Sequence, residues 1–162
     1  MSVSSPSSQR SPGIDPRGPR FGAVITTLVL AVALLALPSA FGLVLLALQT
    51  LVFALGTVQG VAASPYGIVF RRHVRPRLAP PDELEDPRPP RFAQGVGLAF
   101  AVVGLVATLA GATTLGLIAV GFALAAAFLN AAFGFCLGCE MYLLLVRLRA
   151  HHEQDAAIGI GR

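Results

Sequence analysis

Two long apolar stretches dominate the pattern of this 162-residue chain. No Asp, Glu, Lys or Arg stands between Phe21 and Phe70, and none stands between Phe92 and Cys139. A membrane helix needs roughly twenty apolar residues, so each stretch is long enough to cross the bilayer twice. Strands of a membrane barrel would alternate apolar and polar residues, and these stretches do not. The pattern therefore predicts an all-α membrane protein whose main partner is the lipid bilayer.

A short break divides each stretch into two spans. The first break is P-S-A at 38–40, and the second is G-A-T-T at 111–114. Proline removes a helical donor, and small polar residues suit a tight connection. The chain is therefore predicted to cross four times, near 21–37, 41–63, 92–112 and 115–135.

The charged residues predict the orientation of these spans. Only 12% of the residues are charged, about half the usual share. The chain has no lysine, and all of its arginines lie before Phe21, between Arg71 and Arg91, or after Cys139. Four crossings bring these three segments to one side, which the positive-inside rule makes cytoplasmic. We therefore expect both termini in the cytoplasm. The absence of lysine suggests a GC-rich genome and hence a bacterium, so the predicted location is a bacterial plasma membrane.

The same heptapeptide occurs twice. D-P-R-G-P-R-F occupies 15–21 and D-P-R-P-P-R-F occupies 86–92, 71 positions apart. The same shift aligns Gln59 with Asn130 and Gly67 with Gly138. Each half is thus predicted to be a helical hairpin, and an even number of spans per half makes the repeat parallel. The fold class follows: two hairpins related by a pseudo-two-fold axis along the membrane normal.

The repeated heptapeptide also has a predicted structural role. Asp15 and Asp86 are expected to cap a short helix that begins at the following proline. We expect the arginines to reach the cytoplasmic headgroups, with Phe21 and Phe92 at the acyl boundary.

These patterns divide the chain into five segments. A disordered tail is expected at 1–14, rich in Ser and Pro. The first hairpin repeat spans 15–70, a cytoplasmic linker spans 71–85, and the second hairpin repeat spans 86–149. A flexible tail is expected at 150–162.

Chemistry is concentrated in one sequence, C-L-G-C. Cys136 and Cys139 are the only cysteines, and the positions aligned with them in the first half hold Pro65 and Ile68. Residues three apart share a helix face, and their Cα atoms lie roughly 5 Å apart, within disulfide range. The pair is predicted to lie at the cytoplasmic interface, with Cys139 as the more exposed, attacking thiol. A break of the fourth helix at Gly134 or Gly138 would expose backbone N–H groups to it.

Five further residues are expected to support the cysteine pair. Arg88 and Arg91 offer cationic neighbours that would stabilise a thiolate. Glu140 follows the second cysteine on the same side of the helix, Gly138 allows close packing, and Tyr142 is an interface anchor.

Other interpretations of these residues remain open. The cysteines could be inert packing residues, or they could bind a metal together with His151 and His152. We predict no metal and no cofactor, and no nucleotide loop, hydrolytic triad or nucleic-acid surface is present. The net charge of +4 is explained by membrane orientation.

The paired heptapeptides and the sequence N-A-A-F-G-F-C-L-G-C-E-M-Y resemble a bacterial membrane family, domain of unknown function 4395. The resemblance covers roughly 14–149, and its most specific part maps onto Cys136, Gly138, Cys139 and Tyr142. The family has no settled activity. Its members are often found near thioredoxin-like and sulfurtransferase genes, which implies thiol or sulfur handling.

Together these features predict a thiol-redox or sulfur-relay membrane protein. Cys136 and Cys139 would exchange disulfides or persulfides with a soluble thioredoxin-like or sulfurtransferase-like partner. One alternative is a small homo-oligomeric transporter of a sulfur species, and another is a structural membrane protein. A quinone-coupled disulfide oxidase fits less well, because such enzymes act on the opposite face.

Overall fold

The structure, a computed structural model, describes residues 13–159, with side chains described as far as His152. Within this range the chain forms helices and one isolated bridge between Ile14 and Glu85, so the predicted all-α class is confirmed. The α-helices are α1 (Arg17–Ala36), α2 (Ala40–Gln59), α3 (Pro65–Val69), α4 (Arg88–Leu109), α5 (Thr113–Phe133) and α6 (Leu137–Gly159). The shorter turns are η1 (Val61–Ala63), η2 (Phe70–Val74) and η3 (Arg75–Arg77).

Four of these helices, α1, α2, α4 and α5, are long and apolar enough to cross a membrane. Their lengths of 20 to 22 residues correspond to about 30 Å at 1.5 Å per residue, which matches the hydrocarbon core. The four predicted spans are therefore present, with ends that differ by a few residues. The chain is a multi-pass membrane protein.

The repeated heptapeptide begins the first helix of each hairpin directly. We expected a separate short helix there, and that prediction is wrong, because α1 and α4 start at Arg17 and Arg88 and continue into the spans. The carboxylates of Asp15 and Asp86 accept hydrogen bonds from the N–H groups of these two arginines, at 3.0 and 2.9 Å. Each aspartate thus satisfies a donor that the first turn of a helix leaves unpaired.

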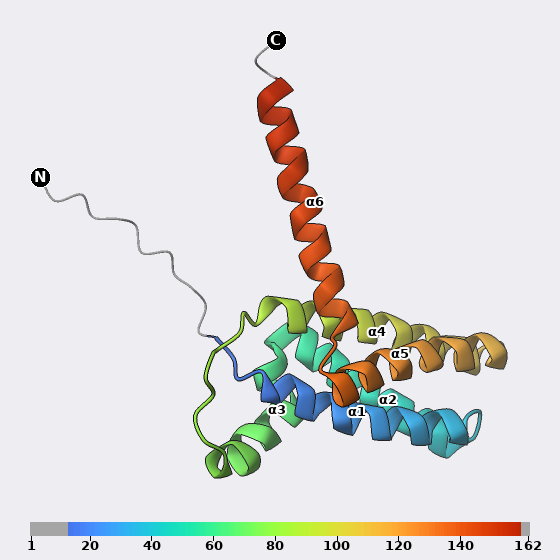
Figure 1. The fold of residues 1–162 in the computed structure, drawn as a ribbon. Coiled ribbons are helices and arrows are strands. Elements are labelled where there is room, and N and C mark those ends of the chain that lie inside the picture. The colour runs from blue at the N-terminus through green and yellow to red at the C-terminus, as the bar shows by residue number, and fades with distance from the viewer. Residues whose placement is uncertain (1–12, 160–162) are drawn as a thin grey trace, which may run out of the picture.

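The four long helices form one bundle, in which α1 packs against α2 and α5, and α4 packs against α2 and α5 (Figure 1). Leu30, Leu46 and Val120 are fully buried at its centre. Small residues allow the helices to approach closely, as is typical within membranes. A Cβ added to Gly104 of α4 would lie only 2.7 Å from Val120 of α5. Many large apolar side chains of these helices are exposed, where lipid would cover them.

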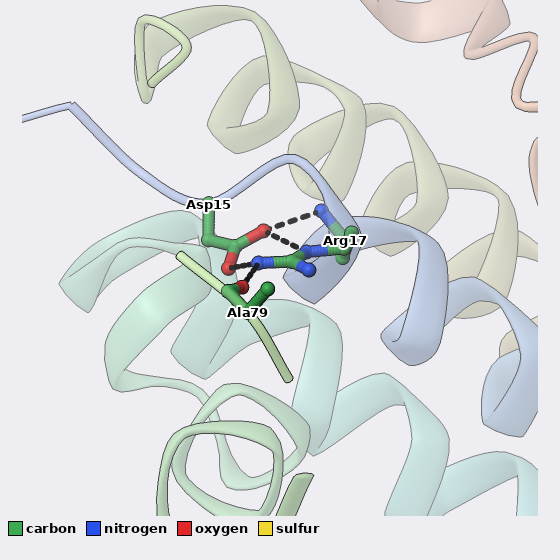
Figure 2. A network of polar contacts seen from close by, with 3 residues as sticks. All are labelled: Asp15, Arg17 and Ala79. Carbon is green, nitrogen blue, oxygen red and sulfur yellow. Dashed lines mark hydrogen bonds and ion pairs between the residues drawn. The ribbon is translucent and has the colours of Figure 1, made fainter. Parts of the chain in front are cut away.

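The linker at 71–85 is held against the start of α1. Ile14 and Glu85 exchange two backbone hydrogen bonds of 2.9 Å. The Arg17 guanidinium donates to both Asp15 carboxylate oxygens and to the carbonyl of Ala79 (Figure 2). These contacts hold the linker against the heptapeptide of the first half. No helix is present in the linker between Arg77 and Arg88.

Helix α6 leaves the bundle and stands across the direction of the four long helices (Figure 1). It packs mainly against α4 near its start, and most side chains from Leu143 to His152 are exposed. A flexible tail was predicted at 150–162, and the structure has helix as far as Gly159. Residues 1–12, which include most of the predicted N-terminal tail, and residues 160–162 lie outside the described part of the chain.

Candidate functional site

The break between α5 and α6 creates the site. Gly134 ends α5 with a φ of 68°, a left-handed conformation that glycine adopts without a Cβ clash. Its N–H and that of Phe135 donate to the carbonyls of Asn130 and Leu129, so the helix end is satisfied. Of the two glycines at which a break was considered, Gly134 is the one that carries it. The chain restarts as a helix at Leu137, which places the cysteine pair at a helix N-terminus.

Cys136 and Cys139 form a disulfide in the first turn of α6. Their Cα atoms are 5.2 Å apart, as the three-residue spacing predicted. The backbone N–H of Cys139 donates to the Cys136 sulfur at 3.3 Å. Cys136 thus lies where an N-cap residue lies, directly before the helix, with its side chain accepting from the amide three residues later. Both cysteines are half-buried.

A serine occupies the corresponding place in the first half of the chain. Ser64 precedes α3, and its hydroxyl oxygen accepts from the N–H of Gly67 at 3.2 Å. Ser64 and Cys136 therefore make the same cap contact, one with oxygen and one with sulfur. The ungapped alignment had matched Cys136 with Pro65, one residue away, because sequence identity alone carries no information about caps.

Gly138 brings the cysteine turn against α4. It is buried, and a Cβ added there would lie 2.6 Å from both the Cα and the Cβ of Ala93. Such a distance is shorter than real Cβ contacts, so any larger residue would push the start of α6 away from α4. The predicted packing role of Gly138 has a definite partner in the structure.

A cavity of about 600 Å³ adjoins the disulfide. Both cysteines and Gly138 line one part of it, and Phe100 and Phe122 line another part. Most of its lining is apolar, and the polar side chains in the lining include those of Thr26, Gln94 and Asn130. Asn130, which the sequence analysis paired with Gln59, thus faces the same cavity as the cysteines.

The cationic side chains in this lining come from the first half of the chain. Arg17 and Arg20 line the cavity, whereas Arg88 and Arg91 line a separate, shallower depression together with Tyr142. From the sequence we expected Arg88 and Arg91 beside the cysteines, because they begin the span of the same hairpin. In the folded chain, α1 packs against α5 and brings the arginines of the other half to that end of the bundle.

Arg20 and Arg91 each bind the end of a helix in the opposite half. Arg20 donates to the carbonyls of Ala131 and Ala132, both at 3.2 Å. Arg91 donates to the carbonyls of Thr57 and Val58, at 2.6 and 2.8 Å. In each case the acceptors lie two and one residues before the helix ends, where carbonyls lack intrahelical partners. These two arginines therefore cap helices. Their contact with the cytoplasmic headgroups stays a prediction.

The phenylalanines of the heptapeptides also have partners within the protein. The ring centroids of Phe21 and Phe70 are 5.7 Å apart, and those of Phe92 and Tyr142 are 5.7 Å apart. Phe70 and Tyr142 each follow the cap residue of their half, Ser64 or Cys136, by six positions. The structure thus gives Tyr142 a packing partner, Phe92, at the start of α4.

Glu140 lies on the exposed side of the first turn of α6. Its N–H donates to the carbonyl of Cys136 at 3.1 Å. A carboxylate in this turn interacts favourably with the helix dipole and so helps the helix to begin here. Within residues 13–152, no group of three or more His, Cys, Asp or Glu side chains is placed to hold a metal ion.

One polar network inside the bundle was not predicted. The Gln49 side chain, only 1% exposed, donates to the Thr26 hydroxyl at 3.4 Å and accepts from the Tyr66 hydroxyl at 2.8 Å. The signal was an amide in the middle of a span, where an unpaired polar group is costly. The amide singled out in the sequence was instead Gln59, which is the exposed last residue of α2.

The fold and site define a four-span helical membrane protein with a Cys-X-X-Cys pair at the start of a further helix. The chain belongs to the family described as domain of unknown function (DUF4395), whose model matches residues 14–147. This confirms the resemblance seen in the sequence. No curated protein and no solved structure matches the chain.

Proposed function

We propose that this protein exchanges disulfides through Cys136 and Cys139 at the cytoplasmic face of a bacterial plasma membrane. One observation carries the proposal: the cysteine pair occupies the first turn of α6, and the Cys139 N–H donates to the Cys136 sulfur. A helix N-terminus stabilises negative charge, and reactive thiolates are found in such positions. The disulfide itself supports a pair that cycles between two redox states.

The exchange begins with Cys136. Its thiolate would attack one sulfur of a partner disulfide, forming a mixed disulfide while the other partner sulfur leaves as a thiolate. Cys139 would then attack the Cys136 sulfur, closing the Cys136–Cys139 disulfide and releasing the second partner thiolate. Two electrons pass to the partner, and the reverse sequence oxidises it. From the sequence we predicted Cys139 as the attacking thiol, but the hydrogen bond to the Cys136 sulfur favours Cys136.

The proposed partner is a soluble thioredoxin-like or sulfurtransferase-like protein. Both cysteines are half-buried and not fully enclosed, so a protein sulfur can reach them from outside the bundle. Attack on a disulfide needs the approach of only one partner sulfur, which suits a shallow contact of this kind.

The cytoplasmic placement rests on charge. Arg20 and Arg91 contact the ends of α5 and α2, so the arginine-rich segments and the cysteines lie at one end of the bundle. The positive-inside rule makes this end cytoplasmic, with the described N- and C-terminal segments on the same side.

The two hairpins are proposed to be a parallel repeat with a pseudo-two-fold axis along the membrane normal. Three reciprocal features support this: the arginine caps, the aromatic pairs and the cap contacts of Ser64 and Cys136. In this interpretation the first half has a structural role only. The second half is the reactive one, because a cysteine, Cys136, occupies the cap position that Ser64 occupies in the first half.

The test is to trap the mixed disulfide. A Cys139→Ser variant, expressed in bacterial membranes, keeps the attacking thiol and cannot resolve the intermediate. We expect it to accumulate disulfide-linked partners that mass spectrometry identifies as thioredoxin-like or sulfurtransferase-like. The matched Cys136→Ser variant should accumulate far less. Equal trapping by both variants and by a Cys136→Ser, Cys139→Ser double variant would contradict the proposal.

A further inference from the structure

The cavity beside the disulfide extends away from the cysteines into the membrane part of the bundle. Gly138 touches Ala93 of α4, and Phe100 lies seven residues further along the same helix, or about 10 Å at 1.5 Å per residue. The rings of Phe100 and Phe122 lie 6.0 Å apart, centroid to centroid. The cavity therefore connects a redox-active pair with a depth at which only lipid-soluble molecules are found.

The lining of the cavity suits a flat ring with polar oxygens on an apolar body. Small residues such as Ala123, Ala126 and Ala127 of α5 line the space between the helices. Gln94 and Asn130 contribute amide groups to the lining, and no hydrogen bond of either side chain is described for residues 13–152. The Gln94 side chain lies over Gly56 of α2. Amide N–H groups at such positions can donate to two carbonyl oxygens of a ligand.

The chemistry of the pair requires a second redox partner. A disulfide exchanged with one soluble protein stops after a single turnover unless another molecule resets the cysteines. Oxidation of the pair by a quinone balances in electrons and protons. The two thiols lose two electrons and two protons and become the Cys136–Cys139 disulfide, and the quinone takes up both electrons and both protons to become a quinol. Quinones with a prenyl tail carry both electrons and protons and dissolve in the bilayer.

We propose that the cavity between α1, α4 and α5 binds a prenylated quinone, with its ring near Gln94 and Asn130 and within reach of the disulfide. The proposal rests on the proposed function, because it names the molecule that resets the same two cysteines. It also sets the direction of exchange, because a quinone that accepts electrons leaves the pair oxidised. A partner thiolate then attacks the Cys136 sulfur of the disulfide, Cys139 leaves as a thiolate, and a second partner thiolate displaces Cys136, which is the reverse of the sequence described above. The cytoplasmic position of the cysteines distinguishes this arrangement from quinone-coupled oxidases that act on the opposite face.

The test uses two neighbouring alanines of α5. Ala126 lines the cavity, whereas Ala125 is exposed on the outside of the bundle and is absent from the lining. Purified protein in lipid nanodiscs is photolabelled with an azido-ubiquinone, and labelled peptides are mapped by mass spectrometry. We expect labels on α4 and α5 near Gln94 and Asn130. Ala126→Phe should reduce labelling at least tenfold, and Ala125→Phe should leave it unchanged.

A photoreactive phospholipid with the same azide serves as the comparison. Competition by excess ubiquinone, and not by excess phospholipid, supports a quinone site. Equal labelling of the Ala126→Phe and Ala125→Phe variants, or equal competition by phospholipid, would overturn it, because a lipid tail would then account for the cavity.

The failure of this proposal can be told apart from failure of the proposed function. Quinone binding is measured in the Cys136→Ser, Cys139→Ser double variant, where labelling should persist without any thiol. Partner trapping is measured in the Cys139→Ser variant, with and without Ala126→Phe. We expect Ala126→Phe to leave trapping intact while it abolishes anaerobic oxidation of the reduced protein by ubiquinone. Trapping of a soluble partner without quinone labelling would refute the quinone site and leave the proposed disulfide exchange standing.

Discussion

The backbone N–H of Cys139 points at the sulfur of Cys136 at 3.3 Å, in the first turn of α6. Ser64 receives the same contact from Gly67 in the first half of the chain. A cap position that elsewhere uses a hydroxyl is thus occupied here by a group that can be oxidised. The two cysteines consequently have unequal surroundings although they are linked to each other.

This inequality predicts unequal thiol reactivity. After reduction, Cys136 in a Cys139→Ser variant should react with iodoacetamide at neutral pH several-fold faster than Cys139 in a Cys136→Ser variant, because its thiolate receives the N–H and faces the positive end of α6. Rates are measured by mass spectrometry. In detergent-unfolded protein, the control, the two rates should become equal. Faster reaction of Cys139 in the folded protein would restore the assignment made from the sequence.

The equivalent contacts of Arg20 and Arg91 predict that replacing either arginine lowers the stability of the bundle by a similar amount. Arg20→Lys and Arg91→Lys each replace a planar fork that reaches two carbonyls with a single ammonium, so each should lower the stability of the bundle by roughly 1 kcal/mol. Thermal unfolding in detergent measures the loss. Arg88→Lys is the matched control, since no hydrogen bond of the Arg88 side chain is described, and it should change little. If all three variants behave like wild type, the arginines act only at the headgroups.

Close packing predicts that a methyl group at Gly138 will disturb the site. Gly138→Ala must move α6 or Ala93, which we expect to cost about 1–3 kcal/mol and to slow closure of the Cys136–Cys139 disulfide. Gly121→Ala on α5 is the control, because a Cβ added there meets no atom within 4 Å. Thermal unfolding and the rate of disulfide closure by oxidised glutathione are measured for both. Equal results would show that the start of α6 does not depend on contact with α4.

Acid should weaken the contact between the heptapeptide and the linker. The hydrogen bond from the Arg17 side chain holds the pKa of Asp15 below its ordinary 3.8. The folded state therefore gains stability from ionised Asp15 above pH 3.8, and this gain is lost as the pH falls through the lower folded value. Between pH 5 and pH 3, wild type should lose more thermal stability than Asp15→Asn, which lacks the titrating group.

Asp86 supplies the control for that experiment. It occupies the same place in the second heptapeptide, but it is exposed and its described hydrogen bond is to the backbone of Arg88 alone. Asp86→Asn should therefore leave the acid sensitivity of wild type unchanged. A similar reduction of acid sensitivity by both variants would place its cause outside the Asp15–Arg17 pair.

The arginine distribution predicts one topology. Reporters fused to the N-terminus, to the linker within 78–86 and to the C-terminus should all be active in the cytoplasm. In intact cells a membrane-permeant maleimide should label the reduced cysteines, and an impermeant one added outside should label neither. An external linker, or labelling by the impermeant reagent, would reverse the orientation.

The sequence alone determined the class of the protein and the approximate positions of its four spans. Apolar stretches without charges can exist in lipid only as helices, since every backbone polar group must be paired within the segment. The three-residue cysteine spacing likewise set the Cα separation, because that distance depends only on local helix geometry. Both properties depend only on residues that are neighbours along the chain, so the amino-acid sequence was sufficient to predict them.

Only the tertiary structure decided which residues meet at the cysteine pair. Arg20 binds Ala131, more than a hundred positions away, because α1 packs against α5. The sequence placed Arg91 beside the cysteines by hairpin membership, yet its fork reaches the end of α2. The start of α6 likewise depended on tertiary packing. The sequence offered Gly134 and Gly138 as possible breaks of the fourth helix. In the structure the break is at Gly134, and Gly138 packs against Ala93 of α4. Which helix ends lie side by side is a property of packing between distant segments, and no local pattern encodes it.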